Sequence, residues 1–406
     1  MKLFRLFCLV ILVITGSAML LSSCQQTRDL RFSPSDTLVP TTITPFSDYQ
    51  LAVAYWLNEH RQLTGSDKPR EIKINTPFEC GVGNKKGVLF IHGLGDSPYF
   101  FEDVAQRLCD QDVWVRTILL PGHGSKPGDM LNASYELWQQ ATNFHVEQFS
   151  LQVDELYLAG FSTGTNLAVV AAGQRDDIAG LLLFSPAFES RFAVTWLAPY
   201  LTGVFSWPNV EREDNPTRYN SMAMQGFAAY QKSVDAVQAS LHRQPVSVPA
   251  LLVVPEGDSV VDVNTVAKLY TAYFRHPASE LLWLGEDEEA PADSQVLSMQ
   301  IPAQRIYGKV SNSLAIVTNY SALKKSFGAD KNFKLHAGVV NYIDYENEGF
   351  KLPITSARFG RVLTKERAYG DERELRIFFE DHGMVNDLID TTVAFDYFPS
   401  EELIKD

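Results

Sequence analysis

Short apolar runs alternate with helical segments between Gly87 and Gly285. Runs such as GVLFIHG, VWVRTILLPG, ELYLAGFS, IAGLLLFSP and PALLVVPEGD have the length and β-branched content of buried strands. Strands separated by helices predict an α/β fold with a doubly wound, mostly parallel sheet. In such sheets ligands bind beyond the carboxyl ends of the strands, so functional residues are expected where these runs end.

The composition narrows the possible partners. Of the 406 residues, 45% are hydrophobic and 21% are charged, as in a globular protein with a large core. The net charge of −14 would repel phosphates, so no nucleic-acid partner is expected. The sequence has no His and Cys cluster at metal-ligand spacing, so neither a metal nor an organic cofactor is expected.

The N-terminus, MKLFRLFCLVILVITGSAMLLSSC, has the layout of a signal peptide, with basic residues before an apolar run. Its end, LSSC, resembles the lipobox of bacterial lipoproteins. That resemblance implies cleavage after residues 1–23, lipidation of Cys24 and a membrane anchor. Gln25 follows instead of the Asp that retains enteric lipoproteins at the inner membrane, so the resemblance implies the outer membrane.

Four further ranges organise the rest of the chain. Residues 24–48 are rich in Ser, Thr and Pro and are expected to form a tether. Residues 49–406 would form one domain with two insertions. The first, about 187–246, is aromatic and apolar without a strand period, as expected of a lid; a packed surface subdomain is the alternative. The second, about 286–375, is discussed with the histidines below.

Cys80 and Cys109 remain after the signal segment and Cys24 are set aside. They form an even pair in an oxidising compartment, which predicts a disulfide. Such a bridge would close a loop of about 30 residues and stabilise the fold by about 3–4 kcal/mol. Two buried free thiols are the alternative, because sequence does not give the distance between them.

Ser162 lies in ELYLAGFSTGTNLAVV, where G-F-S-T-G separates an apolar strand from a helix. A nucleophile elbow has this order, with the serine in a strained turn and glycines two residues away on each side. The helix N-terminus then supplies N–H groups to a developing oxyanion. A glycine turn with an idle serine is the alternative interpretation.

An earlier strand ends in FIHGLGDSP, where a second oxyanion donor would arise. The backbone N–H groups of Leu94 and Thr163 are the predicted oxyanion hole. His92 is expected to orient this loop and not to act as an acid or base.

With these motifs, the chain resembles the α/β-hydrolase superfamily. VWVRTILLPGHGSKPGD and LLVVPEGDSVVD are similar to stretches of its monoacylglycerol lipases, lysophospholipases and carboxylesterases. The resemblance spans about half of the chain, from Gly87 to Gly285. It implies that Ser162 is the nucleophile, that Asp258 is the triad acid and that His123 is a structural loop residue. Asp262 is the alternative acid.

The catalytic histidine is missing from its usual place after the next helix and strand, where EDEEAPADSQ stands. His276 ends a helix, and His336 lies in the predicted strand NFKLHAGVVNYIDY. His382 lies between a predicted strand, RELRIFF, and a predicted closing helix, MVNDLIDTTVAF, which is how these hydrolases commonly end. We therefore assign His382 as the base, although it follows Asp258 by 124 residues, across the insertion at about 286–375.

A second way of matching the C-terminal region to relatives leaves the chain without a catalytic histidine. Some relatives place the catalytic histidine in a Ser-His pair before an apolar segment and a Tyr-Gly; the similar stretch here is ITSARFGRVLTKERAYG, where Ser356 precedes Ala357.

The favoured prediction is a membrane-anchored serine hydrolase that cleaves acyl or lysophospholipid-type esters through an acyl-enzyme. The alternatives are a hydrolase-fold lipoprotein that binds without turnover and a peptidase of the same fold.

Overall fold

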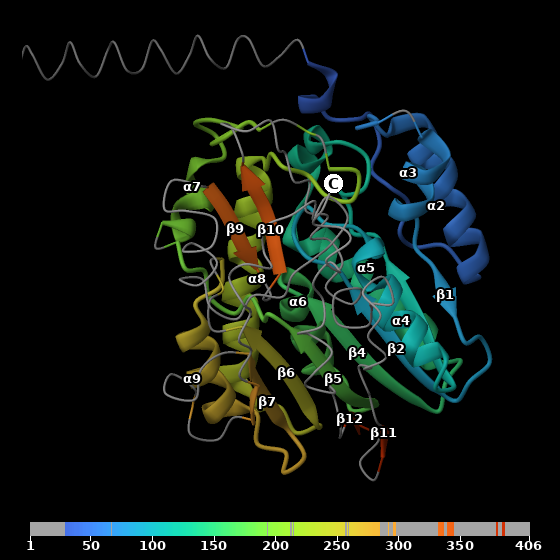
Figure 1. Cartoon of the computed structure of the whole chain (residues 1–406), viewed down its shortest axis with the longest axis vertical. Coiled ribbons are helices and arrows are strands. Elements are labelled where there is room, and N and C mark those ends of the chain that lie inside the picture. Colours follow the sequence, from blue (N-terminus) through green and yellow to red (C-terminus); the bar gives the residue numbers. More distant parts are fainter. Residues whose placement is uncertain are drawn as a thin grey trace, which may run out of the picture.

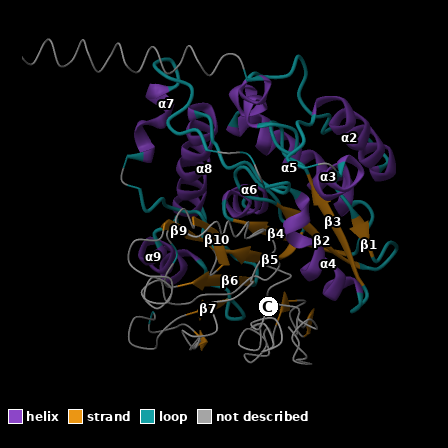
Figure 2. Ribbon diagram, turned by 45° about the horizontal axis from the view of Figure 1, so that its top comes forward, coloured by secondary structure: helices purple, strands orange, loops and turns teal. Residues whose placement is uncertain are grey.

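A central sheet with helices on both sides forms the body of the molecule (Figures 1 and 2). The computed structural model describes residues 29–65, 67–192, 194–211, 213, 215–255, 258, 260–284, 291, 295–297 and the backbone at 332–336, 339–344, 379–380 and 384–385.

The main sheet has eight strands in the order β1-β3-β2-β4-β5-β6-β7-β8. Only the edge strand β1 is antiparallel to its neighbour. The doubly wound, mostly parallel sheet expected from the sequence is therefore confirmed. The strands are β1 (Glu79–Cys80), β2 (Lys86–Ile91), β3 (Val113–Ile118), β4 (Glu155–Phe161), β5 (Ile178–Phe184), β6 (Ala250–Pro255), β7 (Glu280–Leu284) and β8 (Gln295–Leu297).

The helices alternate with these strands, as the sequence pattern predicts. Ser134 illustrates a local start signal, because its hydroxyl accepts a hydrogen bond from Leu137 N (3.2 Å) at the start of α5. The helices are α2 (Phe46–His60), α3 (Lys68–Asn75), α4 (Glu102–Cys109), α5 (Tyr135–Ser150), α6 (Thr163–Ala172), α7 (Ala198–Leu201), α8 (Met224–Arg243) and α9 (Val263–Tyr273), with short 3-10 turns η1 (Leu30–Phe32), η2 (Pro98–Phe101), η3 (Pro127–Asn132) and η4 (Thr195–Leu197).

The principal core lies between the sheet and the helices α5, α6, α8 and α9. Every residue of β3 is buried, and so are nearly all residues of β2, β4 and β5. Strands covered on both faces have no solvated side, which explains why these runs are apolar without alternation. The polar residues that matter for function therefore lie where the strands end.

Cys80 of β1 and Cys109 at the end of α4 form a disulfide, with Cα atoms 5.9 Å apart. The bridge joins the antiparallel edge strand to the helix that precedes β3.

Within the described ranges, no helix combines the length and apolar character needed to cross a membrane.

Much of the predicted tether packs on the domain. Phe32 and Val39 are buried, and the backbone N–H of Ser35 donates to the buried carboxylate of Asp129 (2.5 Å). Trp56 of α2 donates its indole N–H to Thr37 Oγ1 (3.1 Å). From Asp29 onward the segment is thus fixed to the domain by apolar and polar contacts.

The predicted lid range, about 187–246, contains two kinds of structure. Its second part, α8, contributes Tyr230, Val234 and Val237 to the principal core and is integral to the helical layer. Its first part contains η4 and α7, and α7 packs on α8 through Ala198 and Leu201. A lid role for the first part stays a prediction.

The C-terminal ranges add one strand to the main sheet and two separate hairpins. β8 lies inside the range predicted as an insertion, yet it pairs in parallel with β7. His336 ends β9 (Asn332–His336), which pairs with β10 (Val339–Asp344). β11 (Phe379–Glu380) pairs with β12 (Met384–Val385), so the predicted closing helix is extended at its first two residues. His382 lies outside the described residues, as does Cys24.

Candidate active site

Ser162 occupies a strained turn between β4 and α6. Its backbone angles are φ 53° and ψ −121°, a conformation that non-glycine residues rarely adopt. The Ser162 N–H donates to Phe184 O (3.0 Å), which ties the turn to the end of β5. Ser162 is buried, with 7% of the residue exposed. This is the geometry of a nucleophile elbow, as the G-F-S-T-G stretch predicts.

The two flanking glycines are required by close backbone packing. A Cβ on Gly160 would lie 2.5 Å from the carbonyl carbon of Gly164. A Cβ on Gly164 would collide with the carbonyl oxygen of Ile91, on the neighbouring strand β2. The spacing therefore lets α6 turn back across β4 and β2 without steric conflict, which holds Ser162 at the apex.

The loop after β2 lies beside the serine. A Cβ on Gly93 would be 3.1 Å from the Ser162 Cβ, so the loop that carries Leu94 passes next to the nucleophile. Thr163 is the first residue of α6, and a helix leaves its first N–H groups without intrahelical partners. Leu94 and Thr163 therefore belong to the two segments that meet at Ser162.

His92 fixes this loop as a neutral ring. Its Nε2 accepts from Leu120 N (3.1 Å), so its Nδ1 carries the proton and donates to Gly93 O (2.8 Å). Burial lowers the His92 pKa to about 4. A ring with both nitrogens engaged and a low pKa orients the loop, which agrees with the role expected from the sequence.

His123 packs against it, with ring centroids 4.7 Å apart. Burial, and then the neighbouring His92, hold the pKa of His123 well below its ordinary value. His123 Nδ1 approaches Pro121 O (3.2 Å), and the residue is fully buried. The structural role expected of His123 follows from these contacts.

Asp258 follows β6 and is fully buried. Its Oδ1 accepts from the N–H groups of Val260 (2.8 Å) and Val261 (3.0 Å). Its backbone carbonyl accepts from Arg191 Nη1 (2.7 Å). The carboxylate is therefore held in one orientation at the carboxyl edge of the sheet, where β5 alone separates β6 from β4.

Asp262, the alternative acid, has a different function. Its Oδ1 accepts from the N–H groups of Asn264 (3.1 Å) and Thr265 (3.3 Å), and its Oδ2 accepts from Thr265 Oγ1 (3.1 Å). These bonds make Asp262 the N-cap of α9. The geometry thus favours Asp258 over Asp262 as an acid for catalysis.

Ser185 is a residue that the sequence reasoning missed. It follows β5 with φ 46°, and its hydroxyl donates to Asp258 Oδ2. Its N–H donates to Val253 O (2.8 Å) of the next strand. The signal in the sequence was its position: in IAGLLLFSP, Ser185 directly follows the apolar run and therefore lies at the same end of the sheet as Ser162 and Asp258.

A second network joins the nucleophile turn to the segment after β5. Thr165 Oγ1 donates to Ser162 O (2.6 Å) and accepts from Ala187 N (3.2 Å). Asn166 Nδ2 donates to Ala187 O (2.9 Å) and to Ser233 Oγ (3.0 Å) on α8. The turn, the β5 end and α8 are thus linked through buried hydrogen bonds.

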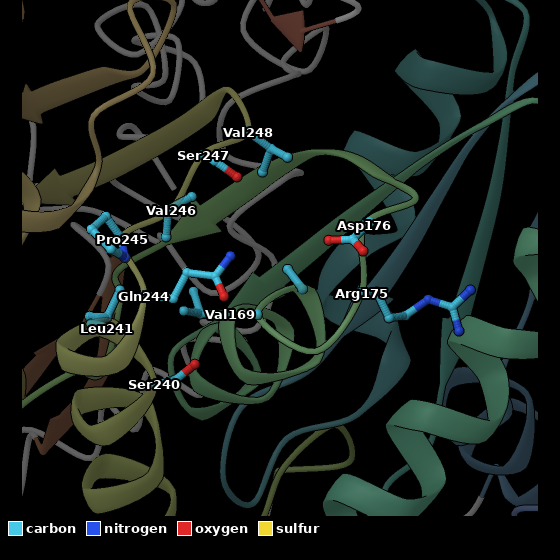
Figure 3. A pocket seen from close by; sticks show the side chains of 12 residues that line it. Val169, Arg175, Asp176, Ser240, Leu241, Gln244, Pro245, Val246, Ser247 and Val248 are labelled. Atoms are coloured by element: carbon cyan, nitrogen blue, oxygen red, sulfur yellow. The ribbon is translucent and has the colours of Figure 1, made fainter.

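A cavity of about 100 Å³ lies at the other edge of the sheet, between the C-terminal ends of α6 and α8 (Figure 3). Val169, Ser240 and Val248 line it. The guanidinium of Arg175 points away from it in Figure 3 and donates to Asp177 (2.7 Å). Because Ser162 lies before the start of α6 and this cavity lies at the end of α6, the cavity is separate from the elbow.

Among the described residues, no cluster of three or more His, Cys, Asp or Glu side chains could hold a metal ion.

The part of the chain that carries these residues also matches a known family model. Residues 83–276, slightly less than half of the chain, match the family model described as serine aminopeptidase, S33. The matched range contains the elbow, the His-Gly loop and Asp258, and it ends before His336 and His382. The sheet order and the elbow are those of the α/β-hydrolase fold.

No curated protein matches the sequence. Similar solved structures include one from work on LipS and LipT, two metagenome-derived lipolytic enzymes, at 24% identity and TM-score 0.45 over 52% of this chain and 87% of that one. Others are the monoacylglycerol lipase of Paleococcus ferrophilus (19%, TM-score 0.44, 53% and 92%) and a soluble variant of monoglyceride lipase from Saccharomyces cerevisiae (14%, TM-score 0.43, 51% and 80%).

Proposed function

We propose that this protein is a serine hydrolase that cleaves carboxylic esters. The observation that carries the proposal is Ser162 at φ 53°, on a strand–turn–helix unit closed by Gly160 and Gly164. A non-glycine residue in such a conformation costs free energy, which is justified when the turn presents a reactive side chain. The family match over residues 83–276 supports hydrolysis.

The mechanism assigns one role to each predicted residue. Ser162 Oγ attacks the ester carbonyl while His382 takes its proton, and the N–H groups of Leu94 and Thr163 hold the oxyanion. His382 then protonates the leaving alcohol. Water, deprotonated by the same histidine, cleaves the acyl-enzyme and restores Ser162. Asp258 orients the imidazole and stabilises its charged form.

Two sequence features suggest the class of substrate. Residues 192–210 carry no charged side chain, and LSSC predicts a lipid on Cys24. Both features favour acyl or lysophospholipid-type esters at the outer membrane. Replacement of Cys24 by Ser should release the protein from membranes; a variant that still fractionates with the outer membrane would contradict the anchor.

Two alternative functions would give different results with ester and amide substrates. A peptidase is supported by the description of the matched family as serine aminopeptidase. It would hydrolyse amino-acid p-nitroanilides faster than p-nitrophenyl esters. A binding lipoprotein without turnover is motivated by Ala357, which follows Ser356 where some relatives place the base. It would react with neither substrate.

The test is labelling by a fluorophosphonate, together with hydrolysis of short p-nitrophenyl esters. Wild type should react with both, and Ser162→Ala should lose both. His382→Ala should lower kcat about 10³-fold or more, because serine without a base is a poor nucleophile. His336→Ala is the matched control and should retain activity. The reverse result would move the base to His336, and an inert but folded wild type would overturn catalysis.

A further inference from the structure

The segment from Phe192 to Val210 exposes an unusual amount of apolar surface. Among the described residues, thirteen large hydrophobic side chains are exposed, and seven of them lie in this segment. Phe192, Val194, Trp196, Tyr200, Val204 and Phe205 are 38–75% exposed. We call these six residues the lid face. Single exposed apolar residues are ordinary, but such a concentration marks a contact surface.

The helical part of this segment is two-sided. Ala198 and Leu201 face inward, where they pack with Met224 and Ala228 of α8. Trp196 and Tyr200 are four residues apart, so they lie on one side of the helical turns, and they are 58% and 75% exposed. The lid face is therefore the outer side of a segment that is already anchored to the core.

The chemistry of the lid face suits a lipid interface. No charged residue lies between Arg191 and Glu211, in a chain with a net charge of −14. Insertion of this segment would therefore not require an ion to lose its hydration. Trp and Tyr combine an apolar ring with a polar atom, which favours the boundary between acyl chains and headgroups.

The N-terminal segment brings the predicted lipid to the same side of the molecule. Phe32 contacts Trp207 edge to face, with ring centroids 5.0 Å apart, and Trp207 follows the lid-face residue Phe205 by two positions. Ser35 is fixed to Asp129. Only four residues separate Cys24 from Asp29, so an extended link reaches roughly 18 Å at most. A lipid on Cys24 would therefore enter the bilayer close to the lid face.

We propose that the lid face docks on the surface of a phospholipid bilayer and that, with the lipid of Cys24, it fixes the domain at two points. This deepens the proposed function, because ester substrates would then enter from the membrane. A second apolar contact with the bilayer would add to the membrane affinity that a lipid anchor supplies and would restrict the orientation of the domain.

Trp196 provides a built-in probe. It is 58% exposed, whereas Trp56, Trp114, Trp138 and Trp283 are buried and Trp207 is partly buried. The full protein is mixed with phosphatidylcholine vesicles whose acyl chains carry bromine, which quenches fluorescence on contact. Docking predicts quenching that is lost in Trp196→Phe. The readout requires no turnover, so Ser162→Ala should behave as wild type.

A matched pair of variants tests the surface itself. Tyr200→Ser should lower the quenching and slow hydrolysis of esters embedded in vesicles about tenfold, but not hydrolysis of soluble esters. Tyr55→Ser removes an equally exposed tyrosine (73%) from α2 and should change neither. Equal effects of the two variants, or no quenching of Trp196, would overturn the proposal.

Two further outcomes separate this proposal from others. Concentration-dependent dimers without vesicles, with Trp196 shielded, would assign the lid face to a second copy of the chain and overturn membrane docking. Quenching by brominated lipid in a protein that hydrolyses no ester would support docking while the proposed function fails. Because added vesicles meet the same surface without an anchor, failure of Cys24 lipidation does not remove the test.

Discussion

The turns after β4 and β6 present Ser162 and Asp258, the two members of the predicted triad that the structure describes, by different physical means. Ser162 is positioned by backbone packing, because Gly160 and Gly164 leave no room for a side chain where α6 crosses the sheet. Asp258 is positioned by hydrogen bonds that its carboxylate accepts from Val260 N, Val261 N and Ser185 Oγ. The nucleophile turn should therefore be sensitive to added volume, whereas the acid turn should be sensitive to lost donors.

The acid turn gives the largest expected effect. Asp258→Asn should lower kcat about 10⁴-fold, because an amide does not favour the catalytic histidine tautomer. Asp262→Asn is the matched control, since Asn also caps helices well. It should leave both kcat and the melting temperature nearly unchanged. A large loss in Asp262→Asn with an active Asp258→Asn would exchange their roles.

On the nucleophile side, Gly164→Ala should destabilise the fold by about 3 kcal/mol or more and abolish fluorophosphonate labelling, because the new Cβ meets the Ile91 carbonyl oxygen. Gly203→Ala is the control, since no atom lies within 4 Å of the corresponding Cβ position. Thermal unfolding and labelling measure the two effects. A stable, labelled Gly164→Ala protein would show that packing does not fix the turn.

A smaller effect is expected for Ser185→Ala, which removes the donor to Asp258 Oδ2 but adds no volume. We expect kcat to fall about tenfold with little change in KM, since one hydrogen bond to a charged group is worth about 1.5–3 kcal/mol. Ser185→Thr keeps the hydroxyl and should restore part of kcat. An equally impaired Ser185→Thr would indicate a packing role instead.

Acid pH should affect the nucleophile side through His92. Its pKa is lowered from 6.5 to about 4 in the folded protein, so the unfolded chain binds more protons between these values. The stability contributed by the neutral ring is complete above about pH 6.5 and is lost as the pH falls towards 4. Denaturant titrations at pH 7, 5 and 4 should show this slope, and His92→Gln should reduce it but not abolish it, because burial also lowers the pKa of His123 and of His145. An unchanged slope in that variant would assign the dependence to other groups.

The turn at Ser162 could be predicted from the sequence, whereas the hydrogen bond between Ser185 and Asp258 could not. The G-F-S-T-G stretch and the strand runs predicted the elbow because their determinants are local: glycine spacing, apolar runs and helix starts. Ser185 was missed because its partner, Asp258, lies 73 residues further along the chain. The choice between Asp258 and Asp262 likewise depended on where each carboxylate points.

The N-terminal and C-terminal segments also differ in what local sequence could predict. Its Ser, Thr and Pro content predicted a tether at 24–48, but Phe32 and Ser35 find partners on Trp207 and Asp129 that composition does not reveal. His382 stays a prediction.

By itself, the sequence determined the alternating α/β architecture and the strained serine turn, because both follow from periodicity and backbone sterics within a few residues. Only the tertiary structure decided which carboxylate joins the sheet edge through Ser185 and which side of residues 192–210 stays exposed. Those features depend on contacts between segments far apart in the chain, whose closure is set by the packing of the whole domain and not by any local pattern.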